Sequence, residues 1–351
     1  MTTEPRRLAE IDVLRGLAAL TVVFSHYNPH WDRFLEEIPV LVPNSFGHDA
    51  VLLFFVISGF VIFMSIEKCQ TVLDFAALRF SRLYPAYWAT LIFSSLLTAL
   101  LFGKNVWLPG VVVNLSMFQE FAGYPNVDNV YWSLTVELAF YLNVAWLFAL
   151  GLHRRRKMLV AVWLASSAVW ALTVRDPAIE TRGLLALLFA FDFSAYFSIG
   201  IVFFDAMKHG WSKARAMLIA LAIFTAGLTT DWQGAALAAL FAAIFALAIG
   251  GRLARLVSPI TLWLGAISYS LYLIHRNIGY LALDWLHANQ FGPIMGIAIT
   301  TAGALALATI FTYAVERPSL RILRTAYQAL RARASPAHNR ETPSRKHSSR
   351  S

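Results

Sequence analysis

Ten long apolar segments are the feature of this sequence that most restricts its fold. Each has 17 to 24 residues. This is close to the roughly 20 residues that cross the hydrocarbon layer of a bilayer as a helix. A segment in lipid must satisfy its own backbone hydrogen bonds, so we expect each one to be helical. The sequence therefore predicts an all-α integral membrane protein, a bundle of about ten transmembrane helices. The segments are 11–27, 49–66, 85–102, 131–150, 158–174, 183–204, 214–230, 232–250, 260–283 and 292–315.

The composition excludes other classes of protein. Hydrophobic residues make up 58% of the chain and charged residues 14%, whereas soluble domains carry about 25% charged residues. Disordered chains combine low hydrophobicity with high charge, so a disordered chain is excluded. A water-soluble globule is disfavoured, because one core would not bury so much apolar surface. The single cysteine, Cys69, allows no internal disulfide and no zinc-binding cysteine cluster, and we expect no bound metal.

Lysine and arginine residues alternate between the loops in a way that indicates the orientation of the helices. Cytoplasmic loops of membrane proteins carry an excess of these residues. With the N-terminus in the cytoplasm, 23 of the 29 fall in inner loops or tails, four in outer loops and two within apolar segments. This distribution predicts a multi-pass protein of the inner membrane with both termini cytoplasmic. It also accounts for the net charge of +9 without nucleic acid as a partner. The inner set is Arg6, Arg7, Lys68, Arg79, Arg82, Arg154, Arg155, Arg156, Lys157, Lys208, Lys213, Arg215, Arg252, Arg255, Arg317, Arg321, Arg324, Arg331, Arg333, Arg340, Arg345, Lys346 and Arg350, and the outer set is Arg33, Lys104, Arg175 and Arg182.

The apolar segments divide the chain into three parts. We expect a cytoplasmic N-terminal tail (1–10), a transmembrane domain (11–318) and a basic, disordered cytoplasmic tail (319–351). The first apolar segment follows two arginines, as in a signal peptide. Asp12 and Arg15 interrupt it, however, and no clear cleavage site of small residues follows, so we expect a retained helix.

The first apolar segment carries two ionisable side chains on one face. Arg15 and His26 are eleven residues apart, so on a helix they point about 20° from each other and lie roughly 16 Å apart along the axis. Asp12 precedes Arg15 by three residues and can pair with it. A charge at bilayer depth is costly, so such residues are functional candidates. The alternative is an anchoring arginine and an interfacial histidine.

Two further ionisable residues are expected in the outer half of the bundle. Glu137 lies about two turns into its segment, and His275 lies past the middle of another. Together with His26 they predict one layer in which a carboxylate and imidazoles act as a general base. A structural hydrogen-bond network is an equally good interpretation of Glu137 and His275. Asp192 is a weaker candidate, for which a hydrogen bond that joins helices is the favoured interpretation.

Two arginines on the inner side form a candidate anion site. Arg79 and Arg82 are three residues apart, so on a helical turn they project from one face. Guanidinium groups suit phosphates. The alternative is ordinary positive charge on the cytoplasmic side. For Cys69, a packing thiol is favoured over a covalent acyl-cysteine.

Six short motifs follow one another along the membrane domain. They are DVLRGLAALTVVFSHY at 12–27, FFVISGFVI at 54–62, RFSRLYPAYW at 79–88, WSLTVELAFY at 132–141, SYSLYLIH at 268–275 and VERP at 315–318. Together they resemble the acyltransferase-3 family of integral membrane O-acyltransferases, which includes O-antigen and nodulation-factor acetyltransferases. The Arg-x10-His spacing of Arg15 and His26 and the Arg-x2-Arg spacing of Arg79 and Arg82 both fit that family.

The resemblance implies transfer of an acyl group, often acetyl, from cytoplasmic acyl-CoA. The implied acceptor is a hydroxyl of a glycan, a lipid-linked saccharide or a small exported molecule. In this interpretation His26 is the essential base, Arg15 is its partner along the pore, and Arg79 and Arg82 lie on the acyl-CoA side. Acyl-CoA is a substrate, and no permanently bound cofactor is expected.

Departures from the family pattern and other function classes leave alternatives open. Leu52 stands where many members have a polar or acidic residue, and Arg276 follows His275 where others have a different residue. Both differences affect the expected preference for an acceptor more than the expected class of reaction. A secondary transporter would also use buried His, Glu and Arg side chains, but it typically shows internal repeats or broken helices at matching positions. A membrane sensor would not require an arginine and a histidine on one helix face.

Overall fold

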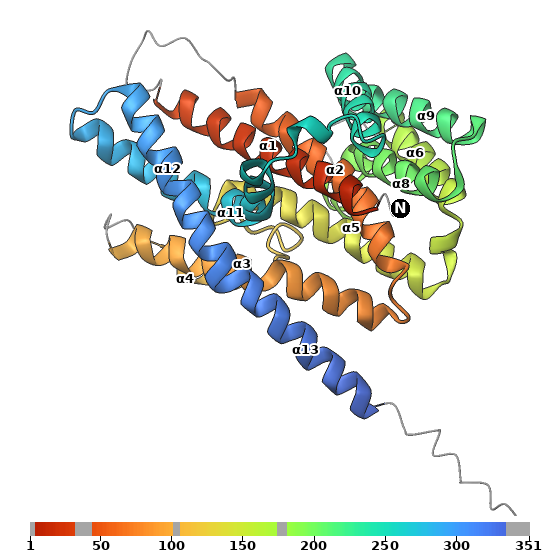
Figure 1. Cartoon of the computed structure of the whole chain (residues 1–351), viewed down its shortest axis with the longest axis horizontal. Helices are drawn as coiled ribbons and strands as arrows, with labels where there is room; N and C mark the ends of the chain where they lie inside the picture. Colours follow the sequence, from red (N-terminus) through yellow and green to blue (C-terminus); the bar gives the residue numbers. More distant parts are fainter. Residues whose placement is uncertain (1–3, 32–43, 101–105, 174–180, 335–351) are drawn as a thin grey trace, which may run out of the picture.

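The computed structural model describes residues 4–31, 44–100, 106–173 and 181–334. Within these ranges the regular structure is entirely helical, and the helices form one bundle from which α13 extends (Figure 1). This confirms the predicted helical class. The α-helices are α1 (Glu4–Trp31), α2 (Asn44–Ile66), α3 (Val72–Leu100), α4 (Leu108–Asn114), α5 (Trp132–Ala149), α6 (Arg156–Thr173), α7 (Thr181–Phe189), α8 (Ser194–His209), α9 (Lys213–Thr229), α10 (Trp232–Ile249), α11 (Pro259–Ala288), α12 (Pro293–Phe311) and α13 (Arg317–Ala334).

Each of the ten predicted apolar segments overlaps a helix of the structure. The sixth segment, 183–204, is divided between α7 and α8, which are bent by 48° around Ala190, a residue with a φ of 48°. By length and composition, five helices of the described residues could each cross a membrane, and the bent pair would be a sixth. The chain thus has several membrane-crossing helices, whereas the count of ten and the cytoplasmic position of both termini remain predictions.

The prediction of a disordered tail from residue 319 is wrong for its first part, because α13 continues the chain as a helix to Ala334. Its sequence is rich in Arg, Ala and Leu, which favour helices. Near its end, Tyr327 Oη donates to the Asp74 carboxylate (2.7 Å) and Arg331 pairs with the same group (2.9 Å), so α13 is attached to α3. Residues 335–351 of the predicted tail, and the first three residues of the predicted N-terminal tail, lie outside the described residues.

Glycines bring α1 and α11 into direct backbone contact. A Cβ added to Gly16 would lie 2.7 Å from the Gly265 nitrogen, and one added to Gly265 would lie 2.2 Å from the Asp12 carbonyl oxygen. Further along, Tyr27 packs on Gly279, so the two helices run parallel. Small residues permit such close approach between membrane helices, where van der Waals packing stabilises the contact. This contact sets the positions of all polar side chains on the facing sides of α1 and α11.

A second pair of glycines joins α2 to α8. A Cβ on Gly59 would lie 2.1 Å from the Phe197 carbonyl oxygen, and one on Gly200 would lie 1.9 Å from the Val56 carbonyl oxygen. Aromatic side chains fill the space beside this contact, with the rings of Phe55 and Phe197 stacked at 4.8 Å. α2 therefore lies between α1 on one side and α8 on the other (Figure 1).

Replacement of Gly265 by Ala should destabilise the protein. The added methyl group would force α1 and α11 apart, and such overpacking costs about 1–3 kcal/mol. Gly303→Ala on α12 is the matched control, because a Cβ there meets nothing within 4 Å and alanine favours a helix by about 1 kcal/mol over glycine. In thermal unfolding in detergent we expect a lower Tm for the first variant and an unchanged or higher Tm for the second. Equal Tm values would contradict the assigned contact.

Candidate functional site

His26 on α1 and His275 on α11 form a hydrogen-bonded pair. His275 Nε2 lies 3.0 Å from His26 Nδ1, and the two ring centroids are 5.1 Å apart. His275 is fully buried, whereas His26 is partly exposed. The Tyr27 hydroxyl donates to the His275 carbonyl oxygen (2.7 Å) and holds this turn of α11 against α1. The structure thus brings together two of the three residues predicted to share an outer layer.

The hydrogen bonds of the pair determine which ring nitrogens carry protons. A neutral imidazole has one donor and one acceptor nitrogen, and their assignment follows from the partners. His275 Nδ1 faces the carbonyl oxygens of Tyr272 (2.9 Å) and Leu271 (3.2 Å), which only accept, so Nδ1 is the donor and Nε2 the acceptor. His26 Nδ1 faces that acceptor and the Val22 carbonyl oxygen (3.0 Å), so it is also a donor. His26 Nε2 therefore keeps its lone pair.

Three arginines line a second feature, a cavity of about 130 Å³ within the bundle, which we call the arginine cavity. Arg15 enters it from α1, and Arg79 and Arg82 enter it from α3. Glu137 is the acidic residue of its lining, so the charge of the lining favours an anion. The other lining residues are Val51, Phe54, Phe55, Ile57, Ser58, Val61, Ile62, Leu83, Ser133, Leu134, Tyr141, Ser268, Tyr269 and Tyr272.

Arg82 is neutralised by a carboxylate from the far end of the chain. Its guanidinium group forms an ion pair with the buried Glu316, which also accepts a hydrogen bond from Ser270 Oγ (2.8 Å). Glu316 ends a π-helical turn, Thr312–Glu316, between α12 and α13. Such turns occur frequently at functional sites. This ion pair fixes Arg82 at the wall of the cavity.

Arg79 is held in a different way. One of its terminal nitrogens donates to Ser65 Oγ (3.1 Å), and its guanidinium group lies over the rings of Phe75 (5.8 Å) and Tyr141 (5.7 Å). Its Nε is buried and has no hydrogen-bond partner within the described residues. Of the two α3 arginines, Arg79 thus keeps more capacity to bind an anion.

Glu137 lies with the arginines rather than with the histidines. Its carboxylate accepts hydrogen bonds from Ser58 Oγ (2.7 Å) and from the Tyr141 hydroxyl, and it lines the arginine cavity. The expected layer of His26, Glu137 and His275 is therefore divided: the histidines touch each other, and the carboxylate is placed in the cavity.

Tyr272 connects the cavity to the histidine pair. Its ring lines the cavity and lies 5.8 Å from the ring of His275. Its hydroxyl donates to the Val130 carbonyl oxygen (2.9 Å) and lies 2.7 Å from Ser133 Oγ. One continuous set of side chains thus runs from the arginines past Tyr272 to His275 and His26.

The remaining predicted residues have structural contacts. Asp12 pairs with Arg15 at 3.5 Å, as predicted from their spacing. Cys69 Sγ donates to the Ser65 carbonyl oxygen (3.4 Å), and burial raises the pKa of this thiol above its ordinary value, which disfavours the nucleophilic thiolate. Asp192 lies in a 3₁₀ turn between α7 and α8 and is exposed.

Next to the histidine pair, the Arg276 guanidinium group lies 3.6 Å from the carboxylate of the buried Asp128. Burial raises the pKa of the Asp128 carboxyl group, against which the backbone N–H groups of Val130 and Asn277 stabilise the charged form. The segment before α5 is thereby attached to α11 next to the histidines.

The sequence did not identify Glu316, Tyr141 and Tyr272 as site residues. Glu316 belongs to the VERP motif, and a lone acidic residue between an apolar segment and a basic tail was a signal for a buried ion pair. The tyrosines carried no such signal, because aromatic residues are frequent throughout this chain.

Comparisons with known proteins are consistent with the motifs. A family model described as "Acyltransferase domain" matches residues 8–313. The chain is 27% identical to the acyltransferase MdmB of Streptomyces mycarofaciens, over 90% of this chain and 92% of the relative. It is 24% identical to Nodulation protein 10 of Rhizobium leguminosarum bv. viciae, over 91% and 95% of the two chains. It is also 24% identical to a putative acetyltransferase, ORF330, of Acidianus two-tailed virus, over 82% and 87%. No solved structure matches.

Loss of the Glu316 carboxylate should destabilise the protein through Arg82. Removing one partner of a buried ion pair costs about 3–5 kcal/mol, because the other charge is left unpaired. We expect Glu316→Ala to lower the Tm strongly, and the double variant Arg82→Met/Glu316→Leu to recover part of the loss. Thermal unfolding in detergent measures both. A Glu316→Ala variant with an unchanged Tm would show that this pair does not stabilise the fold.

Proposed function

The chain belongs to the acyltransferase-3 family and is an acyltransferase, and we propose that it moves an acyl group, acetyl in the simplest case, from acyl-CoA to a hydroxyl group, with His26 as the general base. The observation that carries this proposal is the histidine pair. His275 Nε2 accepts a hydrogen bond from the N–H group at His26 Nδ1, which leaves the lone pair of His26 Nε2 free to take a proton from the acceptor hydroxyl. Positioned general bases of this kind contribute about 10²–10⁴-fold to a reaction rate.

The donor binds through the arginine cavity. Arg79 and Arg82 attract the phosphates of coenzyme A, and the pantetheine arm extends past Arg15 towards His26, about 16 Å further along α1. A cavity of about 130 Å³ has the volume of about four liquid water molecules. It accommodates a part of the pantetheine arm, and the nucleotide remains outside it.

The reaction is a direct transfer between the two substrates. The acceptor hydroxyl loses its proton to His26 Nε2, and its oxygen attacks the thioester carbonyl carbon. The carbon–sulfur bond breaks, an ester forms, and the coenzyme A thiolate leaves and takes up the proton from His26. His275 stabilises the protonated His26 by accepting from Nδ1, so it is a positioning residue. Glu137, held by Ser58 and Tyr141, orients the groups that line the donor route.

The chain is a multi-pass membrane protein, and we place it in the inner membrane with the donor on the cytoplasmic side. The acceptor class is a glycan, a lipid-linked saccharide or a small hydroxylated molecule that enters from the side of His26. Membership of an acyltransferase family favours this reaction over a secondary transporter that uses the same buried charges.

Replacement of His26 by Ala should abolish acyl transfer, because it removes the nitrogen that takes up the proton of the acceptor hydroxyl. The measurement is the release of free coenzyme A thiol from acetyl-CoA by proteoliposomes supplied with candidate hydroxyl acceptors. His347→Ala is the control, since that histidine lies outside the six motifs and outside the matched residues 8–313. Full activity of folded His26→Ala protein, as judged by gel filtration, would refute the assignment of the base.

Arg79→Gln should weaken the binding of acyl-CoA and leave the KM of the acceptor unchanged. A hydrogen bond to a charged group contributes about 1.5–3 kcal/mol, so the KM of the donor should rise about 10- to 100-fold. Arg333→Gln, on the exposed surface of α13, is the control for loss of one positive charge. A rise in the acceptor KM alone would place Arg79 at the acceptor site instead.

A further inference from the structure

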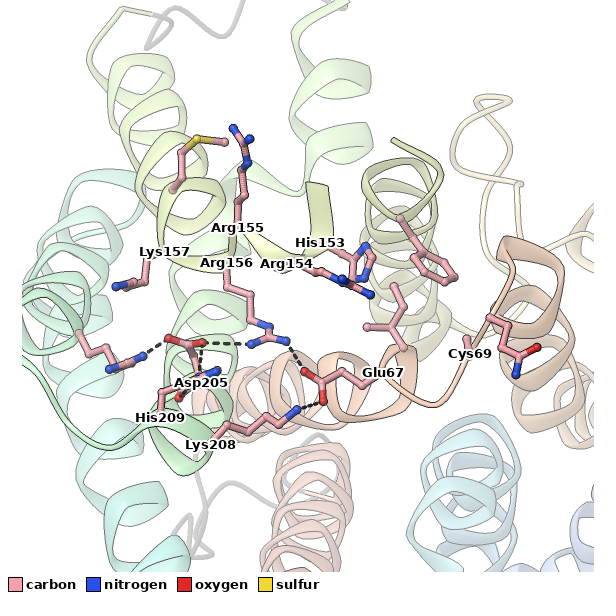
Figure 2. A pocket seen from close by; sticks show the side chains of 15 residues that line it. Glu67, Cys69, His153, Arg154, Arg155, Arg156, Lys157, Asp205, Lys208 and His209 are labelled. Carbon is pink, nitrogen blue, oxygen red and sulfur yellow. Dashed lines mark hydrogen bonds and ion pairs between the residues drawn. The ribbon is translucent and has the colours of Figure 1, made fainter. Parts of the chain in front are cut away.

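A large basic pocket lies outside the proposed active site, where α2, α6, α8 and α9 meet. Its volume is about 1070 Å³, and Figure 2 shows the side chains that line it. It is on the side where the lysine and arginine distribution predicts the cytoplasm. The lining residues of this basic pocket are Ile66, Glu67, Cys69, Gln70, Phe148, His153, Arg154, Arg155, Arg156, Lys157, Met158, Asp205, Lys208, His209 and Arg215.

Positive charge in the basic pocket exceeds negative charge. Six lysine or arginine residues line it, against the two acids Glu67 and Asp205. Both acids are used within the protein. Arg156 bridges them, Lys208 also pairs with Glu67, and Arg215 pairs with Asp205 (2.8 Å), as Figure 2 shows for the labelled members.

Several N–H groups of the basic pocket remain available to bind an anion. Arg154, Arg155 and Lys157 are exposed and form no ion pair within the described part of the chain. Arg156 is more than nine-tenths buried, and its Nε has no hydrogen-bond partner among the described residues. A buried donor without a partner costs free energy, which a bound anion would recover. His153 adds no charge at neutral pH, because burial, Arg154 and Arg156 lower its pKa.

Two helices also begin at the pocket. α6 starts at Arg156 and α9 starts at Lys213, next to the pocket residue Arg215. The N-terminus of a helix carries partial positive charge and free N–H groups, which favour anions. Together with the unpaired cations they make this end of α6 and α9 strongly attractive to a phosphate.

An apolar groove continues directly from the basic pocket. It runs between α6 and α9, has a volume of about 790 Å³ and shares Lys157 and Met158 with the pocket. Its rim is open to the surroundings, since Met217 is 71% exposed and Phe224 is 61% exposed. The other residues of this apolar groove are Ala161, Ala214, Leu218, Ala220 and Leu221.

We propose that the basic pocket and the apolar groove together bind one anionic phospholipid, with its phosphate headgroup in the pocket and an acyl chain along the groove. Basic pockets between membrane helices on the cytoplasmic side suit the headgroups of anionic lipids. A phospholipid has its phosphate joined to its acyl chains, as the pocket is joined to the groove at Lys157 and Met158. A free phosphate or the nucleotide of coenzyme A would leave the groove empty. The site is separate from the arginine cavity and does not depend on the proposed reaction.

Lipid addition to the full-length protein in detergent tests this proposal. We expect phosphatidylglycerol or cardiolipin to raise the Tm of the wild-type protein and to remain bound in native mass spectrometry, whereas phosphatidylcholine at the same concentration has a much smaller effect. Addition of coenzyme A should not displace the bound lipid. Equal effects of the anionic and zwitterionic lipids, or displacement by coenzyme A, would overturn the proposal.

The triple variant Arg154→Gln/Arg155→Gln/Lys157→Gln removes the unpaired cations. Each basic residue near an anionic headgroup contributes about 1 kcal/mol, or about a factor of five in affinity, so the variant should bind phosphatidylglycerol about 10- to 100-fold more weakly. Arg252→Gln/Arg255→Gln/Arg321→Gln is the matched control, with the same loss of charge at exposed positions outside the pocket. An equal loss of binding in the control would show attraction to net charge only and would refute a built site.

The groove is tested by Ala220→Trp, which fills it without changing any charge. Ala220 is exposed, so the folded bundle should tolerate the indole ring. We expect weaker binding of long-chain phosphatidylglycerol and unchanged binding of a soluble short-chain analogue with the same headgroup. Unchanged binding of both would show that no acyl chain lies in the groove.

Discussion

The contact between α1 and α11 is the constraint on which the proposed active site depends. Because Gly16 and Gly265 let the two backbones touch, the parallel helices stay together over several turns. His26 then lies against His275, and the Tyr27 hydroxyl bonds to the backbone of the same turn. The tautomer of each imidazole follows from these neighbours. The two imidazoles thus form a hydrogen-bonded pair instead of two isolated polar groups in lipid, and His26 Nε2 keeps a free lone pair.

The ion pairs show how charge is tolerated inside the bundle. Arg82 and Arg156 each have carboxylate partners, which offsets the cost of burial. Arg79 is held instead by a hydroxyl group and two aromatic faces, so its charge is not neutralised by an adjacent acid. Among the described residues, the arginine cavity keeps one guanidinium group without an adjacent acid, that of Arg79, and the basic pocket keeps two, those of Arg154 and Arg155. We propose the arginine cavity as the site of the acyl donor and the basic pocket as the site of a membrane lipid.

Much of this arrangement could be predicted from the sequence. The apolar segments predicted the helices. The spacing of Arg15 and His26 predicted that these two side chains lie on one face of the first helix. Helical spacing does not determine how a helix is rotated against its neighbours, and for that reason Glu137 was assigned to the histidines although it faces the arginines. The pairing of Arg82 with Glu316 joins residues 234 positions apart, which no local pattern reveals. The helical start of the tail was missed because its charge was interpreted as disorder, whereas Tyr327 and Arg331 attach it to Asp74.

The protonation of the ring nitrogens of His26 and His275 tests most directly whether His26 can act as the general base. Nitrogen-15 NMR of histidine-labelled protein in bilayers distinguishes protonated from unprotonated ring nitrogens, and the signals can be assigned by comparison with His26→Gln and His275→Gln. We expect that, at neutral pH, both rings are protonated at Nδ1 and that His26 Nε2 is unprotonated. A proton on His26 Nε2, with Nδ1 as the acceptor, would contradict the role of His26 as the base that receives the hydroxyl proton.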